Sequence, residues 1–254
     1  MKCRVLLLSA IAIASAFTTA PLFAYEAKPP LGVVELFTSQ GCSSCPPADD
    51  VLADLARSGN AIALGYHVNY WDYLGWKDTF GSAENTARQN DYGKSFGIRS
   101  VYTPQAVING RTHVNGADRG AVSGALKSLA RSGEGLNIGI DVTRSGESVM
   151  IDTQGARNGV GNAHLVLVYF DPVREIVIGR GENKGRTIDY VNPVTDFQTV
   201  GMWHGKPARF EFPMSEIAKK GGCAVLLQSV SKDGLPGAIL GAALVENLDA
   251  DSPL

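Results

Sequence analysis

Two cysteines, Cys42 and Cys45, are separated by two serines within the stretch Gly41–Asp50. Cysteines at this spacing can close a disulfide or open to a dithiol, so they can exchange with other thiols and disulfides. An apolar run, Val33–Phe37, precedes the pair, and a segment typical of a helix, Ala48–Arg57, follows it. Free backbone N–H groups and the positive dipole end of a helix favour a thiolate over a thiol. The sequence therefore predicts a reactive dithiol at a helix start.

The segments around the cysteines predict alternating strands and helices. Strands at Gly32–Thr38 and Ile62–Val68 flank the first helix, and this order predicts a parallel pair with a right-handed crossover. Asn69–Phe80 is rich in aromatic residues, which form either part of the core or a groove or lid beside the cysteines. Further on, the sequence predicts a helix at Ser82–Phe96, a short strand opened by Pro104, an Asn109-Gly110 turn, a return strand at Arg111–Val114 and a helix at Asp118–Arg131.

This ordered set of elements resembles the thioredoxin superfamily over roughly residues 32–131. The runs Val34–Pro47 and Trp71–Trp76 resemble more closely a family of exported bacterial proteins, known as a domain of unknown function with a thioredoxin-like fold. The second resemblance extends over most of the chain after its first 24 residues. It implies a fold and leaves the substrate open.

The superfamily resemblance implies a role for each matching residue. Cys42 resembles the exposed nucleophile, and Cys45 resembles the buried resolving thiol. Pro104 resembles the cis-proline that packs against the disulfide, and the backbone of Thr103 would pair with a substrate strand. Ser43 and its neighbour replace the residues found between many redox cysteines and offer no base, so a strongly oxidising protein is not implied.

Glu35 is the one charged residue within the first strand. One interpretation is a partly solvated carboxylate at the sheet edge. The other is a semi-buried acid beneath the thiols that relays protons during exchange. The sequence leaves both open.

From about Gly133 the pattern changes to short strands separated by glycine-rich or polar turns. The sequence predicts an antiparallel β-sandwich domain over residues 133–254, after a thioredoxin-like domain at 25–132. Gly179–Arg186 is charged and glycine-rich but lacks the spacing of a phosphate-binding loop, so it predicts a solvated hairpin loop. Cys223 is interpreted as a small buried hydrophobic residue, and a third redox thiol is the alternative. The predicted strands are Leu136–Val142, Ser148–Asp152, His164–Phe170, Arg174–Ile178, Ala208–Phe212, Ala224–Val230 and Ile239–Val245, with a helical turn at Met214–Lys220.

The first 24 residues have the pattern of a signal peptide. Lys2 and Arg4 precede an apolar stretch, Val5–Phe17, that is too short to span a membrane, and small residues follow at Ala20–Ala24. The sequence therefore predicts a periplasmic or secreted protein with no membrane segment after cleavage, and an uncleaved membrane anchor is the alternative. An oxidising compartment allows disulfides to persist.

The charge balance argues against two classes of partner. Removal of Lys2 and Arg4 leaves 21 basic residues against 25 acidic ones, a net charge of −4. This mildly acidic balance gives no electrostatic footprint for nucleic acid or anionic lipid. No cofactor is indicated, and the four histidines do not have metal-ligand spacing to one another.

Three functions remain open at this point. The first is an exported thiol–disulfide oxidoreductase in which Cys42 exchanges with a protein or a small thiol or disulfide and Cys45 resolves the product. The second is a Cu(I)-binding or delivery protein that uses both cysteines with His67 or His113. The third is a non-enzymatic binding module that uses the aromatic stretch or the second domain.

Overall fold

The computed structural model describes residues 30–157, 161–218 and 221–245, so the predicted signal peptide at 1–24 lies outside the described residues. The described part contains four α-helices, one short 3₁₀ helix and thirteen strands. None of its helices is long and apolar enough to cross a membrane. The elements of the first half are β1 (Val33–Thr38), α1 (Pro46–Ser58), β2 (Ile62–His67), η1 (Asp72–Leu74), α2 (Ala83–Phe96), β3 (Gln105–Ile108), β4 (Thr112–Asn115) and α3 (Arg119–Ser132).

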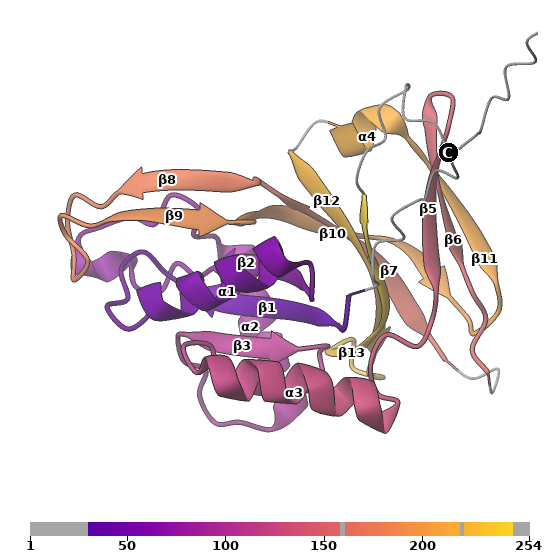
Figure 1. Cartoon of the computed structure of the whole chain (residues 1–254), viewed down its shortest axis with the longest axis horizontal. Helices are drawn as coiled ribbons and strands as arrows, with labels where there is room; N and C mark the ends of the chain where they lie inside the picture. Colours follow the sequence, from indigo (N-terminus) through magenta and orange to yellow (C-terminus); the bar gives the residue numbers. More distant parts are fainter. Residues whose placement is uncertain (1–29, 158–160, 219–220, 246–254) are drawn as a thin grey trace, which may run out of the picture.

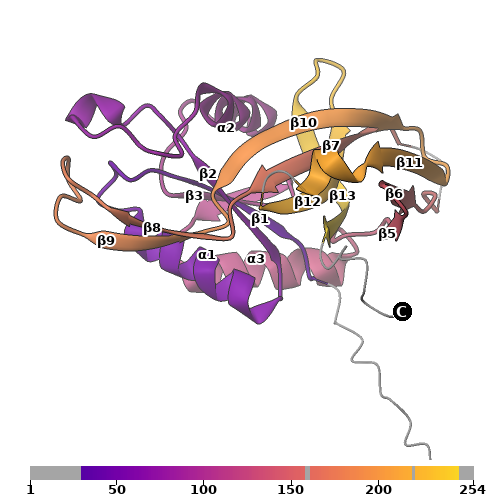
Figure 2. The same cartoon turned by 90° about the horizontal axis from the view of Figure 1, so that it is seen from above.

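The first half forms a four-stranded sheet in the order β2-β1-β3-β4. β1 and β2 run parallel, as the sequence predicted, and β3 and β4 are antiparallel to their neighbours. Because side chains alternate along β1, Val34 and Leu36 pack against α1 and α3, whereas Val33 and Phe37 face the other side, where α2 lies. Figure 2 shows α1 and α3 below the sheet and α2 above it.

Local sequence signals explain where helix α1 begins and ends. Cys45 is the N-cap, and Pro46 and Pro47 fill the first positions, where a missing N–H loses no partner. The helix ends at Gly59, whose φ of 63° is the left-handed conformation that glycine adopts readily. The cysteine pair therefore lies at the positive end of this helix, beyond the last residue of β1.

The second half is almost entirely antiparallel. β10-β7-β12-β13 form one sheet and β11-β6-β5 another, and an apolar cluster that includes Ile151, Leu165 and Trp203 is buried between them. Two antiparallel sheets thus lie face to face, as in a sandwich. The elements are β5 (Ile140–Ser145), β6 (Ser148–Thr153), β7 (Ala163–Phe170), β8 (Val173–Val177), β9 (Thr187–Val191), β10 (Val194–Trp203), β11 (Ala208–Pro213), α4 (Met214–Ala218), β12 (Gly222–Val230) and β13 (Pro236–Val245).

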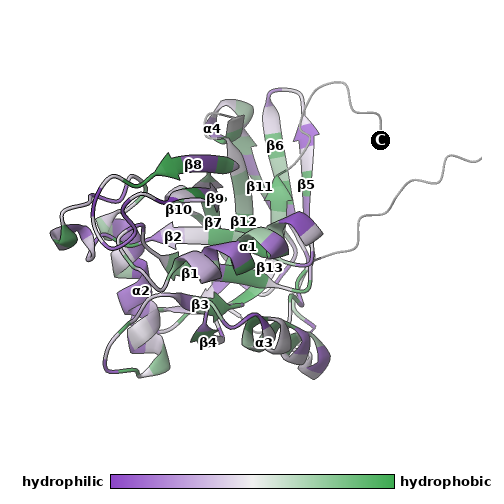
Figure 3. Ribbon diagram, turned by 60° about the vertical axis from the view of Figure 1, so that its left-hand side comes forward, coloured by the Kyte–Doolittle hydropathy of each residue, from purple (hydrophilic) through white to green (hydrophobic). Residues whose placement is uncertain are grey.

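One buried cluster joins the two halves. Phe37 and Tyr66 of the first sheet pack in the same cluster as Val168 of β7 and Leu226 of β12. The larger sheet of the second half is therefore buried on both faces, by the first half on one side and by β11-β6-β5 on the other. Figure 3 shows β13, at the centre of the molecule, coloured largely as hydrophobic.

The hairpin formed by β8 and β9 leaves the second half and extends over the first. β9 contacts α1 and β2, and Asn192 after it accepts a hydrogen bond through its carbonyl from the N–H of Gly65 on β2. In Figure 1 the hairpin lies above α1 and β1, and the loop at its tip turns down toward the loops at that end of the sheet. This places a segment from residue 178 to 186 beside the cysteines.

Candidate active site

Cys42 and Cys45 form a disulfide with a Cα–Cα distance of 5.4 Å. Both cysteines are buried, with exposed fractions of 1% and 0%. The resemblance had implied an exposed Cys42, and the structure differs because Trp71 and the β8–β9 tip cover this loop. A Cβ added at Gly41 would lie 3.1 Å from Cβ of Trp71. Exchange at Cys42 therefore requires a movement of the groups that cover it.

Thr103 contacts the disulfide directly. Its hydroxyl donates to Sγ of Cys42 at 3.3 Å and accepts from Nε1 of Trp71 at 2.8 Å. The following bond, Thr103–Pro104, is cis. In the described part of the chain no hydrogen bond engages the backbone N–H or C=O of Thr103. The structure thus brings Thr103 and Pro104 to the cysteines, with unpaired backbone groups beside them.

A buried carboxyl group lies one helical turn after Cys45. Asp49 accepts a hydrogen bond from the hydroxyl of Thr38 at 2.8 Å through Oδ1, and its Oδ2 is buried without a partner. Burial raises the pKa of Asp49 from 3.8 to about 7, and the positive charge of His67 opposes this shift only in part. Residues four apart share a helix face, so Asp49 and Cys45 lie on the same side of α1.

His67 and Asp78 form a second buried pair that reaches the same loop. Nδ1 of His67 donates to Oδ2 of Asp78 at 2.9 Å, and that oxygen also accepts the N–H of Gln40 at 2.7 Å. Burial lowers the pKa of His67, but the charge and hydrogen bond of Asp78, together with the charge of Asp49, outweigh burial, so the pKa of His67 is raised. Burial likewise opposes ionisation of Asp78, yet His67 and the backbone N–H groups of Gln40 and Phe80 together lower its pKa. The pair fixes the backbone two residues before Cys42.

The tip of the β8–β9 hairpin completes the site. Nδ2 of Asn183 donates to the carbonyl oxygens of Gln40 at 3.0 Å and Cys42 at 2.8 Å. Asn183 is buried, whereas its neighbour Glu182 is exposed and accepts the N–H of Ser43 at 3.1 Å. Hydrogen bonds from the side chain and backbone of Ser43 lower the pKa of Glu182. A segment about 140 residues further along the chain thus holds the cysteine loop.

Glu35 does not join this site. Its Oε1 accepts from Nε of Arg88 at 2.8 Å, and Oε2 accepts from the hydroxyl of Tyr92. Both partners lie on α2, on the face of the sheet opposite α1. The alternation of side chains along β1 therefore points Glu35 away from the helix that begins at Cys45. The partly solvated interpretation also fails, because the side chain is 0% exposed.

Comparisons with known proteins place the chain in a family. Residues 33–228 match the family described as protein of unknown function (DUF1223). The chain belongs to that family. The crystal structure of protein AGR_C_4864 from Agrobacterium tumefaciens is similar to this chain, with a TM-score of 0.79 and 43% sequence identity. The alignment covers 89% of this chain and 98% of that one. No curated protein matches.

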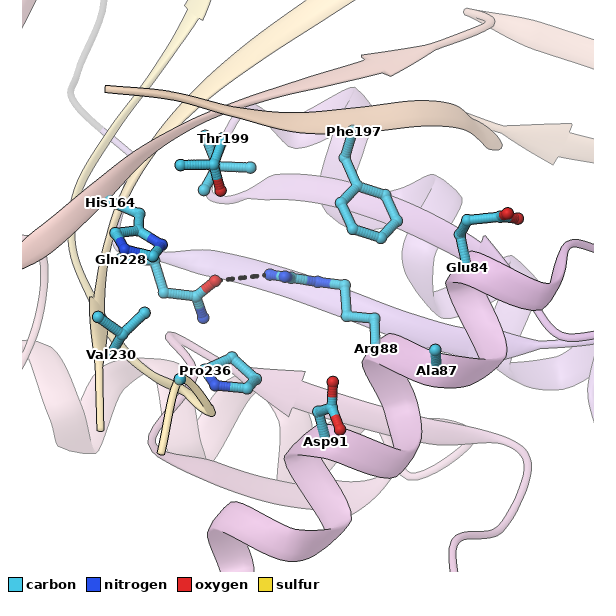
Figure 4. Close-up of a pocket in the computed structure, with 12 residues that line it drawn as sticks. Glu84, Ala87, Arg88, Asp91, His164, Phe197, Thr199, Gln228, Val230 and Pro236 are labelled. Atoms are coloured by element: carbon cyan, nitrogen blue, oxygen red, sulfur yellow. Dashed lines mark hydrogen bonds between the residues drawn. The ribbon is translucent and has the colours of Figure 1, made fainter. Parts of the chain in front are cut away.

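A separate cavity of about 340 Å³ lies between α2 and the larger sheet of the second half. Figure 4 shows Arg88 extending across it toward Gln228, whose Oε1 accepts from Nη2 at 2.9 Å. Glu35 forms an ion pair with Arg88 and balances its positive charge. Because no cysteine is among the described residues that line this cavity, the disulfide remains the candidate active site.

The histidines proposed as copper ligands have other partners. His67 bonds Asp78, and Nδ1 of His113 lies 3.0 Å from the hydroxyl of Tyr102. Within the described ranges no group of three or more His, Cys, Asp or Glu residues could hold a metal ion. The geometry therefore adds no support to the copper hypothesis.

Asp49, Asp78, Asn183 and Glu182 are site residues that were not predicted from the sequence, and His67 was predicted only as a copper ligand. Asp49 carried a local signal, a pair of aspartates in the first turn after the cysteines. Asn183 and Glu182 carried none, because the loop that contains them was interpreted as solvated. It is a hairpin loop, as predicted, but one side of it packs against the cysteines.

Proposed function

We propose that this protein is an exported thiol–disulfide oxidoreductase, with a thioredoxin-like domain at 25–132 followed by a β-sandwich domain at 133–254. The observation that carries the proposal is a disulfide at the N-terminus of a helix with Thr103 bonded to Sγ of Cys42. A helix start stabilises a thiolate, which is the reactive species in exchange. The strand, helix and Thr103–Pro104 arrangement supports the superfamily part of the proposal.

In the proposed reaction the dithiol form reduces a substrate disulfide. The thiolate of Cys42 attacks one substrate sulfur, a mixed disulfide forms, and the other substrate sulfur leaves as a thiolate. Cys45 then attacks Sγ of Cys42, the Cys42–Cys45 bond re-forms, and the second substrate thiolate leaves. Two electrons pass from the protein to the substrate, and the reverse sequence oxidises a substrate dithiol.

Asp49 is the group that we assign to proton transfer at Cys45, in place of Glu35. Cys45 must lose a proton before it attacks Cys42, and it regains one when the disulfide opens. Asp49 shares the buried face of α1 with Cys45 and has an oxygen without a partner. Its pKa of about 7 suits a group that accepts and donates protons near neutrality.

Thr103 is proposed to position the substrate. Its unpaired backbone N–H and C=O can bond an extended substrate segment beside the disulfide. Its hydroxyl meanwhile donates to Sγ of Cys42, an interaction that stabilises a thiolate at that atom. The same residue would therefore orient the substrate and the nucleophile.

The rate of thiol–disulfide exchange catalysed by the purified protein tests the function. Cys42→Ser should abolish catalysis, because the attacking sulfur is removed. Cys223→Ala is the matched control, since burial raises the pKa of that thiol to about 12 and leaves it unreactive. Wild-type protein that does not accelerate exchange, or a Cys42→Ser variant that retains the full rate, would overturn the proposal.

The export part of the proposal rests on the signal-peptide pattern at 1–24. N-terminal sequencing of the protein recovered from a cell's periplasm or medium tests it. A chain that starts after Ala24 is expected. An intact chain found only inside the cell would contradict export.

A further inference from the structure

The tip of the β8–β9 hairpin carries an excess of positive charge in a chain that is acidic overall. Arg180, Lys184 and Arg186 are exposed, and Glu182 is the one acidic residue among residues 178–186. Lys77 is exposed as well. Among the described residues none of these four cations forms an ion pair. Their charge is therefore available to a partner.

Two sets of contacts place this charge beside the cysteines. Lys184 directly follows Asn183, whose amide bonds the carbonyl of Cys42, and Nη1 of Arg186 donates to Oδ1 of Asn183 at 3.2 Å. The ring of Trp76 lies against the tip, 3.1 Å from the position that a Cβ on Gly179 would occupy. Lys77, the next residue after Trp76, therefore flanks the same loop.

A carboxylate of the same tip already occupies the position next to Cys42. Glu182 accepts the N–H of Ser43, the residue directly after Cys42, and its pKa is lowered there. Because Cys42 is 1% exposed, the tip must shift before a substrate sulfur can reach Cys42. Displacement of Glu182 frees the N–H of Ser43, and Lys184 and Arg186 belong to the same tip as Glu182.

We infer that the cysteine pair acts on a small thiol or disulfide that carries carboxylates, with one substrate carboxylate replacing Glu182 at the N–H of Ser43 and the tip cations holding it. This inference rests on the proposed oxidoreductase function. Asp50, exposed in the first turn of α1, and half-buried Asp72, next to Trp71, are acidic neighbours that oppose it. Four exposed cations outnumber these two and Glu182, so the local field favours an anion.

The chemistry follows the exchange already described. The thiolate of Cys42 attacks the anionic disulfide, one carboxylate-bearing thiolate leaves, and the other half stays bonded to Cys42. Cys45 then displaces the bound half as a second thiolate. The protein dithiol supplies both electrons, and no further reductant or oxidant is required.

Oxidation of the reduced protein by two small disulfides of opposite charge tests the inference. Glutathione disulfide is the anionic probe, and cystamine is the cationic one. Each rate constant is divided by that of free dithiothreitol with the same disulfide, which removes the intrinsic reactivity of the probe. The wild-type ratio should favour glutathione disulfide by about 10-fold at low ionic strength and fall toward unity in high salt.

Charge reversal at the tip should remove this preference. In the double variant Arg180→Glu/Lys184→Glu, the ratio of the normalised rate constants should fall close to unity. In Glu182→Gln, the reaction with glutathione disulfide should accelerate more than the reaction with cystamine. The matched control is Lys127→Glu/Arg131→Glu on α3, which packs against β3 and β4 at the other edge of the first sheet and changes the net charge equally.

Each outcome supports or overturns the anionic preference. A wild-type ratio near unity, or an equal change in the tip and α3 variants, overturns the anionic preference while leaving the oxidoreductase function intact. If neither disulfide oxidises the dithiol, the oxidoreductase function itself fails, and the inference fails with it. A ratio lost only in the tip variant supports the inference.

Discussion

At the scale of the residue, Asp49 shows how burial prepares a group for chemistry. The residue is 5% exposed, and one oxygen of its carboxyl group has no partner. A structural carboxylate in such a place would normally be ionised and paired. Burial instead favours the protonated form, because neither His67 nor Thr38 fully compensates the charge. The result is an acid that titrates near neutral pH one turn from a cysteine.

Asp49→Asn should change how stability depends on pH. The folded-state pKa is raised from 3.8 to about 7, so the contribution of Asp49 is fully present below about pH 4 and is lost as the pH rises through 7. The free energy of unfolding of wild type should therefore fall relative to Asp49→Asn over that window, by about 2 to 4 kcal/mol. Chemical denaturation at several pH values measures it.

Asp50→Asn is the matched control, because Asp50 is the exposed neighbour in the same helical turn. It should leave the pH dependence of stability nearly unchanged. A difference between wild type and Asp49→Asn that is constant from pH 4 to pH 7 would rule out an ionisation of Asp49 in that range.

At the scale of the element, the β8–β9 hairpin is the cover of the site. Asn183 and Glu182 at its tip bond the cysteine loop, while β9 packs against α1 and β2. The cysteines are buried because this element of the second half, together with Trp71 of the first half, lies over them. The second half of the chain therefore contributes residues to the site.

Shortening the hairpin should expose the disulfide. In the variant, Gly179–Gly185 is replaced by Asn-Gly, which keeps the pairing from Val173 with Val191 to Val177 with Thr187. Reduction by dithiothreitol should be at least about 10-fold faster, since opening of the tip no longer limits access. The thiols that reduction releases are alkylated, and fluorescence or mass spectrometry of the alkylated cysteines measures the rate of reduction.

Reduction of wild type in denaturant gives the rate for an open disulfide, which the shortened variant should approach. A circular dichroism spectrum that matches wild type establishes that the variant is folded. An unchanged rate in the folded variant would show that the hairpin does not limit access to Cys42.

The sequence predicted the elements that position the two cysteines, but not the elements that cover them. The strand before Cys42, the helix start at Cys45 and the Ser82 cap of α2 all have local signals, and each is present in the structure. β9 and β10 were not predicted. Bulges between Val194 and Asp196 and between Thr199 and Gly201 break the alternation of β10, which is the pattern that identifies a strand.

The strand predicted at Leu136–Val142 was wrong over its first half. β5 begins at Ile140. Asn137 and Ile138 lie outside any strand of the described chain, and both donate their N–H groups to the carbonyl of Leu240 in β13. The alternation of apolar and polar residues there reflects burial beside β13 and not the hydrogen-bond ladder of a strand. A sequence pattern does not distinguish the two.

At the scale of the whole molecule, a buried ionic network joins the halves. Arg88 on α2 bonds Glu35 on β1 and Gln228 on β12, and Nε2 of Gln228 donates to the hydroxyl of Tyr92 at 2.6 Å. The guanidinium also lies 5.4 Å from the ring centroid of Phe197 on β10. Glu35 was interpreted wrongly because its partners lie 53 to 57 residues away, a separation that no local pattern reveals.

Breaking this network should destabilise both halves together. Arg88→Met leaves Glu35 buried without its partner and should cost about 3 to 5 kcal/mol, whereas the double variant Glu35→Gln/Arg88→Met should cost less. Because one core cluster spans the halves, unfolding should remain a single transition. Urea denaturation followed by fluorescence and circular dichroism measures both quantities.

The exposed pair of Arg209 with Asp152, at 2.7 Å, is the control. Arg209→Met should cost less than about 1 kcal/mol, since exposed pairs contribute little. Two separated transitions in wild type, or a double variant that is less stable than Arg88→Met alone, would contradict a shared core held by a matched pair of charges.

The central claim is that Cys42 and Cys45 are a redox couple and not a structural bridge. Equilibration of the folded protein with glutathione and dithiothreitol buffers, followed by alkylation and mass spectrometry, tests it most directly. The account predicts reversible interconversion of disulfide and dithiol, with half reduction at a potential above about −300 mV, where exchangeable disulfides lie. A pair that stays oxidised below that potential until the protein unfolds would contradict the account.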